Sequence, residues 1–308
     1  MAHPASSTAR QTNKGNSTVI TSRENRWLKR FRAALSGERG GDEIVGVEGF
    51  RLVEAGLGSG LSVEALLVSE SGARHLPRIA HVLASTVTVL RTSDKLFASV
   101  ADTQTPQGIA ALVRPRQATI ESLLTGTPLL IVMAGVQDPG NVGTIVRAAE
   151  AFGATGVLTC LADGIGTADP FAPKALRASA GSALRLPIVH GVSATILFGQ
   201  LKMFGVKAVA AVAAGVAEKN RQDHGPDALS PLLRPWDFYW KVSTAILIGN
   251  EGSGLPANLV RSADARVYIP QAAAAAPVGI ESLNAAMAAS VLLYEAMRQR
   301  NTPGQPRS

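Results

Sequence analysis

The first residues whose types and spacing could do chemistry follow the apolar run 129–134. They read QDPGNVGTIVR over residues 137–147. Asn141 is a good helix N-cap, and Gly143 allows backbone or a ligand to approach closely. On a helical wheel Arg147 points away from the apolar face. This segment alone favours a capped turn with a solvated arginine. A nucleotide site is the alternative, although the G-x-G-x-x-G spacing is missing.

A second polar loop follows the apolar run 244–248. It contains three closely spaced glycines, which are Gly249, Gly252 and Gly254. Such spacing indicates close backbone packing or positive φ angles. Asn250 and Glu251 stand between the glycines, where solubility alone does not explain polar side chains. Open parallel sheets bind ligands at the carboxyl ends of their strands, so this loop is either a binding site or an ordinary connection.

A third segment begins a long helical stretch near the C-terminus. Glu281 or Ser282 could cap this helix, which is the simplest role for either residue. Leu283, Met287 and Val291 recur every four residues. We interpret them as core or dimer-interface positions rather than as a cofactor site.

Alternating apolar runs and helical stretches position these segments and divide into two α/β units. The first unit has predicted strands at 44–47, 65–69, 87–90 and 109–113, and predicted helices at 22–35, 50–55, 73–84 and 93–100. The second has predicted strands at 129–134, 156–159, 187–189, 208–212, 244–248 and 266–269, and a last helix at 282–300. Near-continuous apolar strands indicate a parallel sheet covered on both faces.

The domain boundaries follow shifts in composition. Residues 1–19 are rich in Ser, Thr, Asn and Ala without apolar periodicity, which predicts a disordered tail. After this tail we predict a first domain at 20–115 and a linker at 116–127. A second domain at 128–300 and a tail at 301–308 complete the chain.

Composition excludes several classes of protein. Of the 308 residues, 46% are hydrophobic and 17% are charged, which rules out bulk disorder. No apolar run approaches the ~18–20 residues of a membrane span. The single cysteine, Cys160, permits no intrachain disulfide, and the N-terminus lacks the apolar region of a secretory signal. We therefore expect a soluble cytoplasmic protein.

The positive charge is concentrated near the N-terminus. The net charge of the chain is +7, and residues 1–40 hold eight basic side chains against Glu24 and Glu38. A basic, helix-compatible arm on a near-neutral body suggests a polyanionic partner, most plausibly nucleic acid. A solubilising tail is the alternative.

Together the three segments resemble motifs one, two and three of the SpoU (TrmH) branch of the SPOUT RNA methyltransferases. The matching patterns are N-x-G-x-x-x-R, then I-G-N-E-G-x-G-L, then I-P…E-S-L-N before a helix of small residues. All three motifs in this order are specific, whereas one alone would be weak. The resemblance covers residues 128–300, and the preceding part resembles the family's accessory RNA-binding domain.

The resemblance implies a fold, a cofactor and partners. The fold would be α/β, with a C-terminal trefoil-knot parallel sheet and a smaller N-terminal α/β RNA-binding domain. S-adenosylmethionine would bind at Ile248, Gly249, Ile269 and Leu283. A homodimer, with no metal and no membrane, would form the active site between its subunits. It would methylate a ribose 2′-hydroxyl of ribosomal or transfer RNA, with ribosomal RNA favoured.

The resemblance also implies roles for individual side chains. The catalytic set is Asn141, Arg147, Glu251, Ser282 and Asn284. Arg147 would serve the 2′-oxygen or its phosphate, with Asn141 and Glu251 fixing the arginine, while Ser282 and Asn284 would contact substrate or cofactor. The family often casts this arginine as the general base. Because a guanidinium essentially never deprotonates, we favour stabilisation of a developing alkoxide.

The chain departs from the family pattern in two places. The loop 271–280 is longer than usual, which leaves cofactor affinity open. The stretch 217–241 is also long and contains Trp236, Phe238, Tyr239 and Trp240. Packing beneath a long loop is favoured for these aromatic residues over an RNA-stacking patch or a dimer contact.

Two other functions are alternatives to the enzyme. One is a non-enzymatic RNA-binding dimer that keeps the fold, which the intact motif residues argue against. The other is an ordinary Rossmann enzyme. It is disfavoured because the phosphate fingerprint and the acidic ribose ligand are missing.

Overall fold

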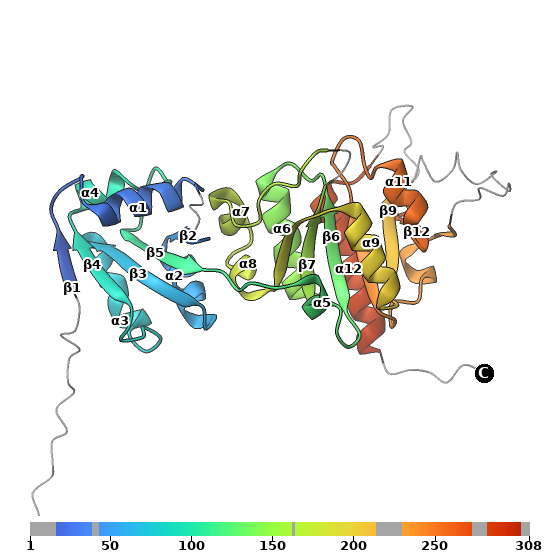
Figure 1. Ribbon diagram of the computed structural model, residues 1–308, viewed down its shortest axis with the longest axis horizontal. Coiled ribbons are helices and arrows are strands. Elements are labelled where there is room, and N and C mark those ends of the chain that lie inside the picture. Colours follow the sequence, from blue (N-terminus) through green and yellow to red (C-terminus); the bar gives the residue numbers. More distant parts are fainter. Residues whose placement is uncertain (1–16, 39–42, 162–163, 214–229, 273–281, 303–308) are drawn as a thin grey trace, which may run out of the picture. The chain divides into compact units, whose positions relative to one another are not determined.

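The structure is a computed structural model that describes residues 17–38, 43–161, 164–213, 230–272 and 282–302 (Figure 1). The described residues form two compact units. Unit 1 contains residues up to Leu57 together with Ser62–Arg114, and unit 2 contains Gly58–Leu61 together with the chain from Pro115 onward. The sequence predicts the end of the first domain at residue 115.

Unit 1 is built on a five-stranded mixed sheet with the order β1-β4-β3-β5-β2. Its strands are β1 (Ser17–Ile20), β2 (Val45–Glu48), β3 (Ser62–Ser69), β4 (Thr88–Thr92) and β5 (Ile109–Arg114). Strands β1, β4 and β3 are parallel, whereas β5 runs antiparallel to β3 and to β2. The four strands predicted for this unit are confirmed as β2 to β5.

Helices cover both faces of the unit 1 sheet (Figure 1). They are α1 (Arg26–Leu35), α2 (Phe50–Gly58), the 3-10 helix η1 (Ser71–His75), α3 (Leu76–Ile79) and α4 (Asp94–Ala98). Helix α1 buries Leu28, Phe31 and Leu35 in the core of one face. Helices α2 and α3 lie over the opposite face. Unit 1 therefore has two outer helical surfaces.

Three expectations for unit 1 are wrong. Residues 17–19 were expected in a disordered tail, but they form β1 because their backbone pairs with the edge of β4. The first helix begins at Arg26 rather than residue 22, since the Asn25 side chain accepts a hydrogen bond from the Trp27 amide at 2.9 Å and caps it. The helix predicted at 73–84 is replaced by η1 and the short α3, which has Pro77 in its first turn.

Unit 2 contains a seven-stranded parallel sheet with the order β10-β12-β9-β11-β6-β7-β8. Its strands are β6 (Leu129–Ala134), β7 (Gly156–Cys160), β8 (Ile188–Val192), β9 (Lys207–Val212), β10 (Leu232–Leu233), β11 (Thr244–Ile248) and β12 (Ala265–Tyr268). Every residue of β6, β7 and β11 is buried, as the continuous apolar runs predict. Only the two-residue edge strand β10 was not predicted.

Helices also cover both faces of the unit 2 sheet. They are α5 (Ile120–Leu123), α6 (Pro139–Ala151), α7 (Pro173–Ala178), α8 (Ser182–Arg185), α9 (Ala194–Met203), the 3-10 helix η2 (Pro235–Asp237), α11 (Ala257–Ser262) and α12 (Ala285–Asn301). Helices α5, α9 and α11 bury apolar side chains in one core. Helices α6 and α12 pack against each other and against β7 and β11. Within the described ranges, no helix combines the length and apolar character needed to cross a membrane.

Helix α12 is fixed at both of its ends. At its start, Asn284 accepts hydrogen bonds from the amides of Ala286 and Met287. Near its end, the guanidinium of Arg300 donates to four backbone carbonyl oxygens, at 2.7 to 3.0 Å. These carbonyls belong to Thr127, Pro128, Trp240 and Val242. Burial of Arg300 lowers its pKa from the ordinary arginine value.

Candidate active site

Loops from two neighbouring strands, β6 and β11, meet at the carboxyl edge of the unit 2 sheet. The strand order reverses between these strands, because the chain leaves β6 toward β7 on one side and reaches β11 from the β9 side. In open parallel sheets such a reversal forms a crevice for ligands. Asn250 joins the two loops, donating from Nδ2 to the carbonyl oxygen of Gly135 at 2.9 Å.

The loop after β11 is held in a closed shape by its own backbone. The amides and carbonyls of Asn250 and Gly254 exchange two hydrogen bonds of 3.0 Å. The Asn250 Oδ1 atom accepts from the amides of Gly252 and Ser253. A Cβ on Gly249 would overlap the backbone of Gly254. The predicted close backbone packing is therefore confirmed. Asn250, which is absent from the predicted catalytic set, holds the loop in this shape through its side chain.

Three predicted catalytic residues form a hydrogen-bonded chain at this edge of the sheet. Asn141 of α6 donates from Nδ2 to Oε1 of Glu251 at 2.7 Å. Its Oδ1 atom accepts from Nδ2 of Asn284 at 3.1 Å. The structure thus brings together one residue from each of the three sequence motifs. We call Asn141, Glu251 and Asn284 the central triad.

The helix caps differ from those expected. Asn141 was predicted to cap α6, but Asp138 is the cap, and its side chain accepts from the Gly140 amide at 3.1 Å. Pro139 follows Asp138 and fits the first helical position, so the helix begins earlier. The last helix is capped by Asn284 rather than by Glu281 or Ser282. Glu281 itself lies outside the described residues.

Arg147 takes no part in the hydrogen bonds of the central triad. It is exposed on α6 and makes no hydrogen bond or ion pair with any residue that the structure describes. Asn141 and Glu251 bond each other here, so the expectation that they fix this arginine stays a prediction. Gly143, another residue of the first motif, has a packing role. A Cβ there would overlap the Ala175 carbonyl, so glycine lets α6 and α7 touch.

The predicted cofactor residues come from three chain segments. Ile248 is buried at the end of β11, and Gly249 begins the glycine loop. Ile269 and Leu283 are half-buried, and they flank the undescribed stretch 273–281, which contains most of the long loop. Gly254 has a φ of +70° and no atom near its Cβ position. Apolar side chains and loop backbone are groups that could hold an adenosyl group. Ser282 is exposed and has no hydrogen-bond partner in the described part of the chain.

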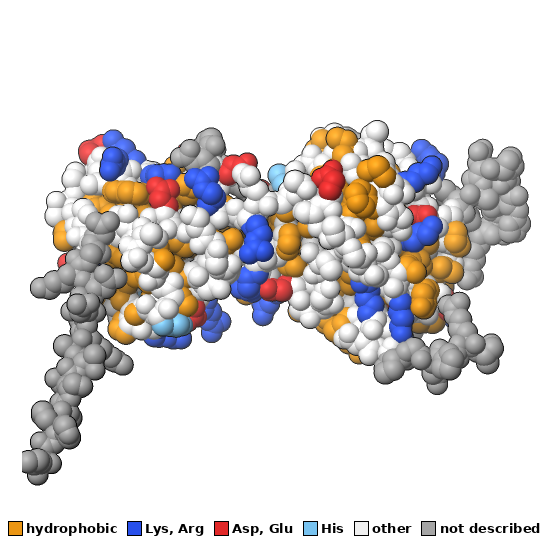
Figure 2. Space-filling model, turned by 60° about the horizontal axis from the view of Figure 1, so that its bottom comes forward, with side chains coloured by type: hydrophobic (Ala, Val, Ile, Leu, Met, Phe, Trp, Pro, Cys, Tyr) orange, Lys and Arg blue, Asp and Glu red, His pale blue; other side chains and the backbone are white. Residues whose placement is uncertain are grey.

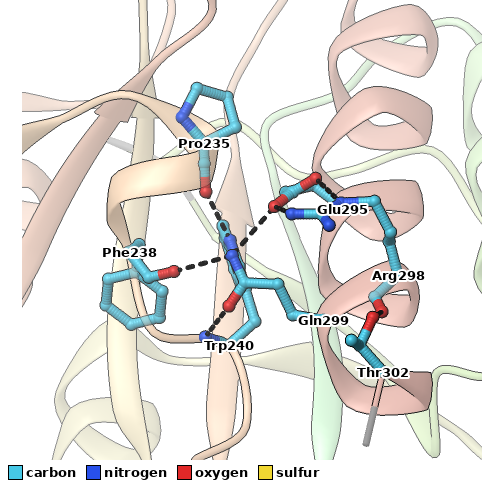
Figure 3. A network of polar contacts seen from close by, with 7 residues as sticks. All are labelled: Pro235, Phe238, Trp240, Glu295, Arg298, Gln299 and Thr302. Atoms are coloured by element: carbon cyan, nitrogen blue, oxygen red, sulfur yellow. Dashed lines mark hydrogen bonds and ion pairs between the residues drawn. The ribbon is translucent and has the colours of Figure 1, made fainter. Parts of the chain in front are cut away.

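Hydrogen bonds join the aromatic segment after β10 to α12 (Figure 3). Trp240 is fully buried and donates from Nε1 to the Pro235 carbonyl at 2.6 Å. Gln299 accepts from the Trp240 amide and donates to the Phe238 carbonyl and to Glu295. The favoured interpretation, packing, is confirmed for Trp240. Two neighbouring aromatic residues, Trp236 and Tyr239, are exposed.

Helix α12 also carries an exposed apolar face. Met287 is 62% exposed, Val291 40% and Tyr294 51%. The spacing of these residues places them on one side of the helix. These side chains are not part of the unit 2 core. The sequence left two interpretations for Met287 and Val291, core or dimer interface, and the structure excludes the core.

Unit 1 presents basic side chains beside rings on both of its helical surfaces. Over one sheet face, Arg26 and Arg30 lie within 6 Å of the Trp27 ring centre. Over the other, the Arg78 guanidinium lies 4.2 Å from the centre of the Phe50 ring, which also stacks on His75. Figure 2 shows Lys and Arg side chains spread over this unit. Basic side chains next to aromatic rings are typical of surfaces that bind nucleic acid.

Residues 128–294, more than half of the chain, match the SpoU rRNA Methylase family. This chain belongs to that family. Residues 37–111 match the MRM3-like substrate binding domain. The central triad, Arg147 and the glycine loop all lie inside the SpoU match, and the basic surface of α2 and α3 lies inside the second match.

Two relatives cover most of this SpoU chain. It is 34% identical to the 23S rRNA (guanosine(2553)-2′-O)-methyltransferase RlmP of Bacillus subtilis, over 80% of this chain and 86% of that protein. It is 31% identical to the 23S rRNA (uridine(2479)-2′-O)-methyltransferase of Streptomyces viridochromogenes, over 91% of this chain and 92% of that protein.

Solved structures resemble this SpoU chain over both units. An AdoMet-bound rRNA methyltransferase from Sinorhizobium meliloti has a TM-score of 0.73 at 28% identity, covering 92% of this chain and 98% of that one. The SpoU methyltransferase AviRb from Streptomyces viridochromogenes, in complex with AdoMet, also has a TM-score of 0.73, at 25% identity, covering 90% of this chain and 98% of that one. The predicted fold class is confirmed.

Proposed function

We propose that this chain transfers the methyl group of S-adenosylmethionine to a ribose 2′-hydroxyl of RNA, with ribosomal RNA as the substrate. The observation that carries the proposal is Arg147, which is exposed and has no hydrogen-bond or ion-pair partner among the described residues, on the helix that also supplies Asn141 to the central triad. The two relatives described above are named 23S rRNA 2′-O-methyltransferases, which favours the enzyme over a non-enzymatic RNA-binding dimer.

The chemistry needs a more nucleophilic ribose oxygen. A bound S-adenosylmethionine supplies a methyl group on a positively charged sulfur, which is already a good electrophile. Arg147 would stabilise the negative charge that develops on the 2′-oxygen as the hydroxyl proton passes to solvent water, and it would do so without losing its own proton. Its planar fork also suits the neighbouring phosphate.

The remaining site residues position the reactants. Ile248, Gly249, Ile269 and Leu283 would hold the cofactor through loop backbone and apolar side chains. The central triad ties the start of α6 to the glycine loop and to the start of α12. It therefore keeps the helix that carries Arg147 in register with the cofactor loop. Ser282 is left exposed to contact substrate or cofactor.

Partners and location complete the proposal. The basic side chains on the helical surfaces of unit 1, such as Arg26 and Arg78, would bind the RNA. The exposed face formed by Met287, Val291 and Tyr294 would pair with a second copy of the chain, giving a homodimer. We also propose the trefoil knot of the family for unit 2 and the cytoplasm as the location, with no membrane and no resident metal as partners.

One experiment tests the proposed function directly. The protein is incubated with S-adenosylmethionine carrying a labelled methyl group and with ribosomal RNA that lacks the modification. Label should enter the RNA and map to a ribose, where it protects the adjacent phosphodiester from alkaline cleavage. Label on a base, or no label in RNA while S-adenosylmethionine still binds, contradicts the proposal.

A further inference from the structure

A bidentate ion pair lies on the same helix as Arg147. Arg185 of α8 donates from Nε to Oε1 of Glu150 at 2.5 Å. It also donates from Nη2 to Oε2 of the same carboxylate at 2.7 Å. Arg185 thus engages both oxygens of Glu150, in the geometry for which a guanidinium is best suited. The hydrogen bond to Arg185 is also the main reason that the pKa of Glu150 lies below its ordinary value.

Glu150 is also the residue on α6 that is best placed to disturb Arg147. Residues three or four apart are neighbours on a helix surface. The helical neighbours of Arg147 at these spacings are Gly143, Thr144, Glu150 and Ala151. Glu150 is the one charged side chain among them. A carboxylate at this position attracts the arginine and weakens the positive charge that it offers to an anion.

We propose that Arg185 is a positioning residue, which keeps the Arg147 guanidinium available to the RNA by engaging the carboxylate of Glu150. This inference rests on the proposed function, in which Arg147 stabilises the ribose oxygen. Arg185 touches neither substrate nor cofactor and acts through Glu150 on Arg147. Thr144 and Ala151 offer no competing charge, so the two hydrogen bonds from Arg185 to Glu150 are sufficient for this role.

Four full-length variants test the inference: Arg185→Gln, Glu150→Gln, the double variant and Arg185→Lys. Arg185→Gln releases a free carboxylate next to Arg147, and we expect kcat to fall about fivefold, which is the effect of one unit charge about 4 Å away in a fully water-screened environment. The KM for S-adenosylmethionine should stay unchanged. Glu150→Gln removes the competitor and should keep nearly full activity. The double variant should recover the activity that Arg185→Gln loses.

The same four variants separate positioning from stability. If the ion pair only joins α8 to α6, then both single variants lose thermal stability and activity together, and the double variant recovers nothing. Arg185→Lys still neutralises Glu150 and should lose less activity than Arg185→Gln. Equal losses in the two single variants, or no rescue in the double variant, overturn the inference.

The proposed function is checked separately with the unmutated protein. If the unmutated protein transfers methyl groups and the Arg185→Gln variant is equally active, the inference is overturned. The proposed function is then still supported. No methyl transfer by the unmutated protein overturns both.

Discussion

Asn141 and Glu251 are 110 residues apart in the sequence, yet the side-chain amide of Asn141 donates to the carboxylate of Glu251 at 2.7 Å. The other polar atom of the Asn141 side chain, Oδ1, accepts a hydrogen bond from Nδ2 of Asn284. One asparagine therefore uses its donor and its acceptor on two different segments. An aspartate has the same shape but lacks the donor, so the two isosteric side chains are not equivalent here.

Replacing Asn141 with Asp should make the stability of the protein depend on pH. The substitution places two carboxylates at hydrogen-bond distance, which raises the pKa of one of them in the folded state. The folded state then binds more protons than the unfolded state above about pH 4, so the free energy of unfolding falls as the pH rises. We expect a deficit of about 1–3 kcal/mol at pH 8 that shrinks at pH 5.

Urea unfolding at the two pH values measures this effect. Asn141→Ala is the matched control, because it removes the same hydrogen bonds without adding a charge. Its deficit should be the same at both pH values. A pH-independent deficit in Asn141→Asp would show that the carboxylates separate.

Replacing Arg147 with Ala should abolish most methyl transfer while S-adenosylmethionine still binds within a few-fold of its normal affinity. Loss of one preorganised donor to a developing oxyanion costs about 100- to 1000-fold in kcat. Arg147→Lys should also fail badly, because a point ammonium does not reproduce the planar fork. Rate assays and calorimetric titration of the cofactor check this. A folded Arg147→Ala protein that no longer binds the cofactor refutes the assigned role.

Replacing Arg300 with Met should destabilise unit 2 by about 2–4 kcal/mol, since four carbonyls lose a charged donor. Arg298→Met on the same helix is the control. Arg298 makes an exposed ion pair with Glu295, and its loss should cost far less stability than the loss of Arg300. Unfolding midpoints of the two variants give the comparison, and similar midpoints would contradict the special role of Arg300.

Replacing Glu295 with Gln should lower the free energy of unfolding at neutral pH but not at acidic pH. Hydrogen bonds from Arg298 and then Gln299 lower the pKa of this carboxyl below its model-compound value of 4.5. A lowered folded pKa gives stability that is present above the unfolded pKa and is lost as the pH falls through the folded pKa. The variant should therefore be up to about 1 kcal/mol less stable at pH 7 and equal at strongly acidic pH. A deficit that persists in acid would rule out the charge as its cause.

Replacing Val291 with Arg should dissociate the proposed dimer. The variant places a charge on the exposed apolar face of α12, where a partner subunit would bury it at a cost of several kcal/mol. Native mass measurements at micromolar concentration should give two chains for the unmutated protein and for the control Val291→Ala. They should give one chain, with activity lost, for Val291→Arg. An active unmutated monomer would overturn the interface.

The sequence predicts the strands of unit 2 well because their apolar runs are continuous and bounded by polar loops. It also predicts which segments form the site, since Asn141, Glu251 and Asn284 each stand in a polar motif next to a strand or a helix. Strand β1 is missed because it has four residues, of which only Val19 and Ile20 are apolar, and because its backbone pairing with the edge of β4 leaves no pattern in the side chains.

The partner of each site residue is the part that the sequence does not reveal. Nothing in the spacing of Asn141 and Arg147 shows that the asparagine bonds Glu251 and leaves the arginine free. The engagement of Glu150 by Arg185 is equally hidden, since it joins residues 35 apart in the sequence. Such pairings depend on how α6, α8 and the β11 loop pack in three dimensions.

The two attachments of α12 have a consequence for biosynthesis. Asn284 at its start bonds Asn141, 143 residues earlier, and Arg300 near its end bonds the carbonyl of Thr127, 173 residues earlier. The ribosome therefore makes β6 and α6 long before the side chains that complete their environment. Contacts of such high sequence separation form late, after large loops have closed. A nascent chain that ends before Asn284 has no complete central triad, so it cannot present the complete site to RNA.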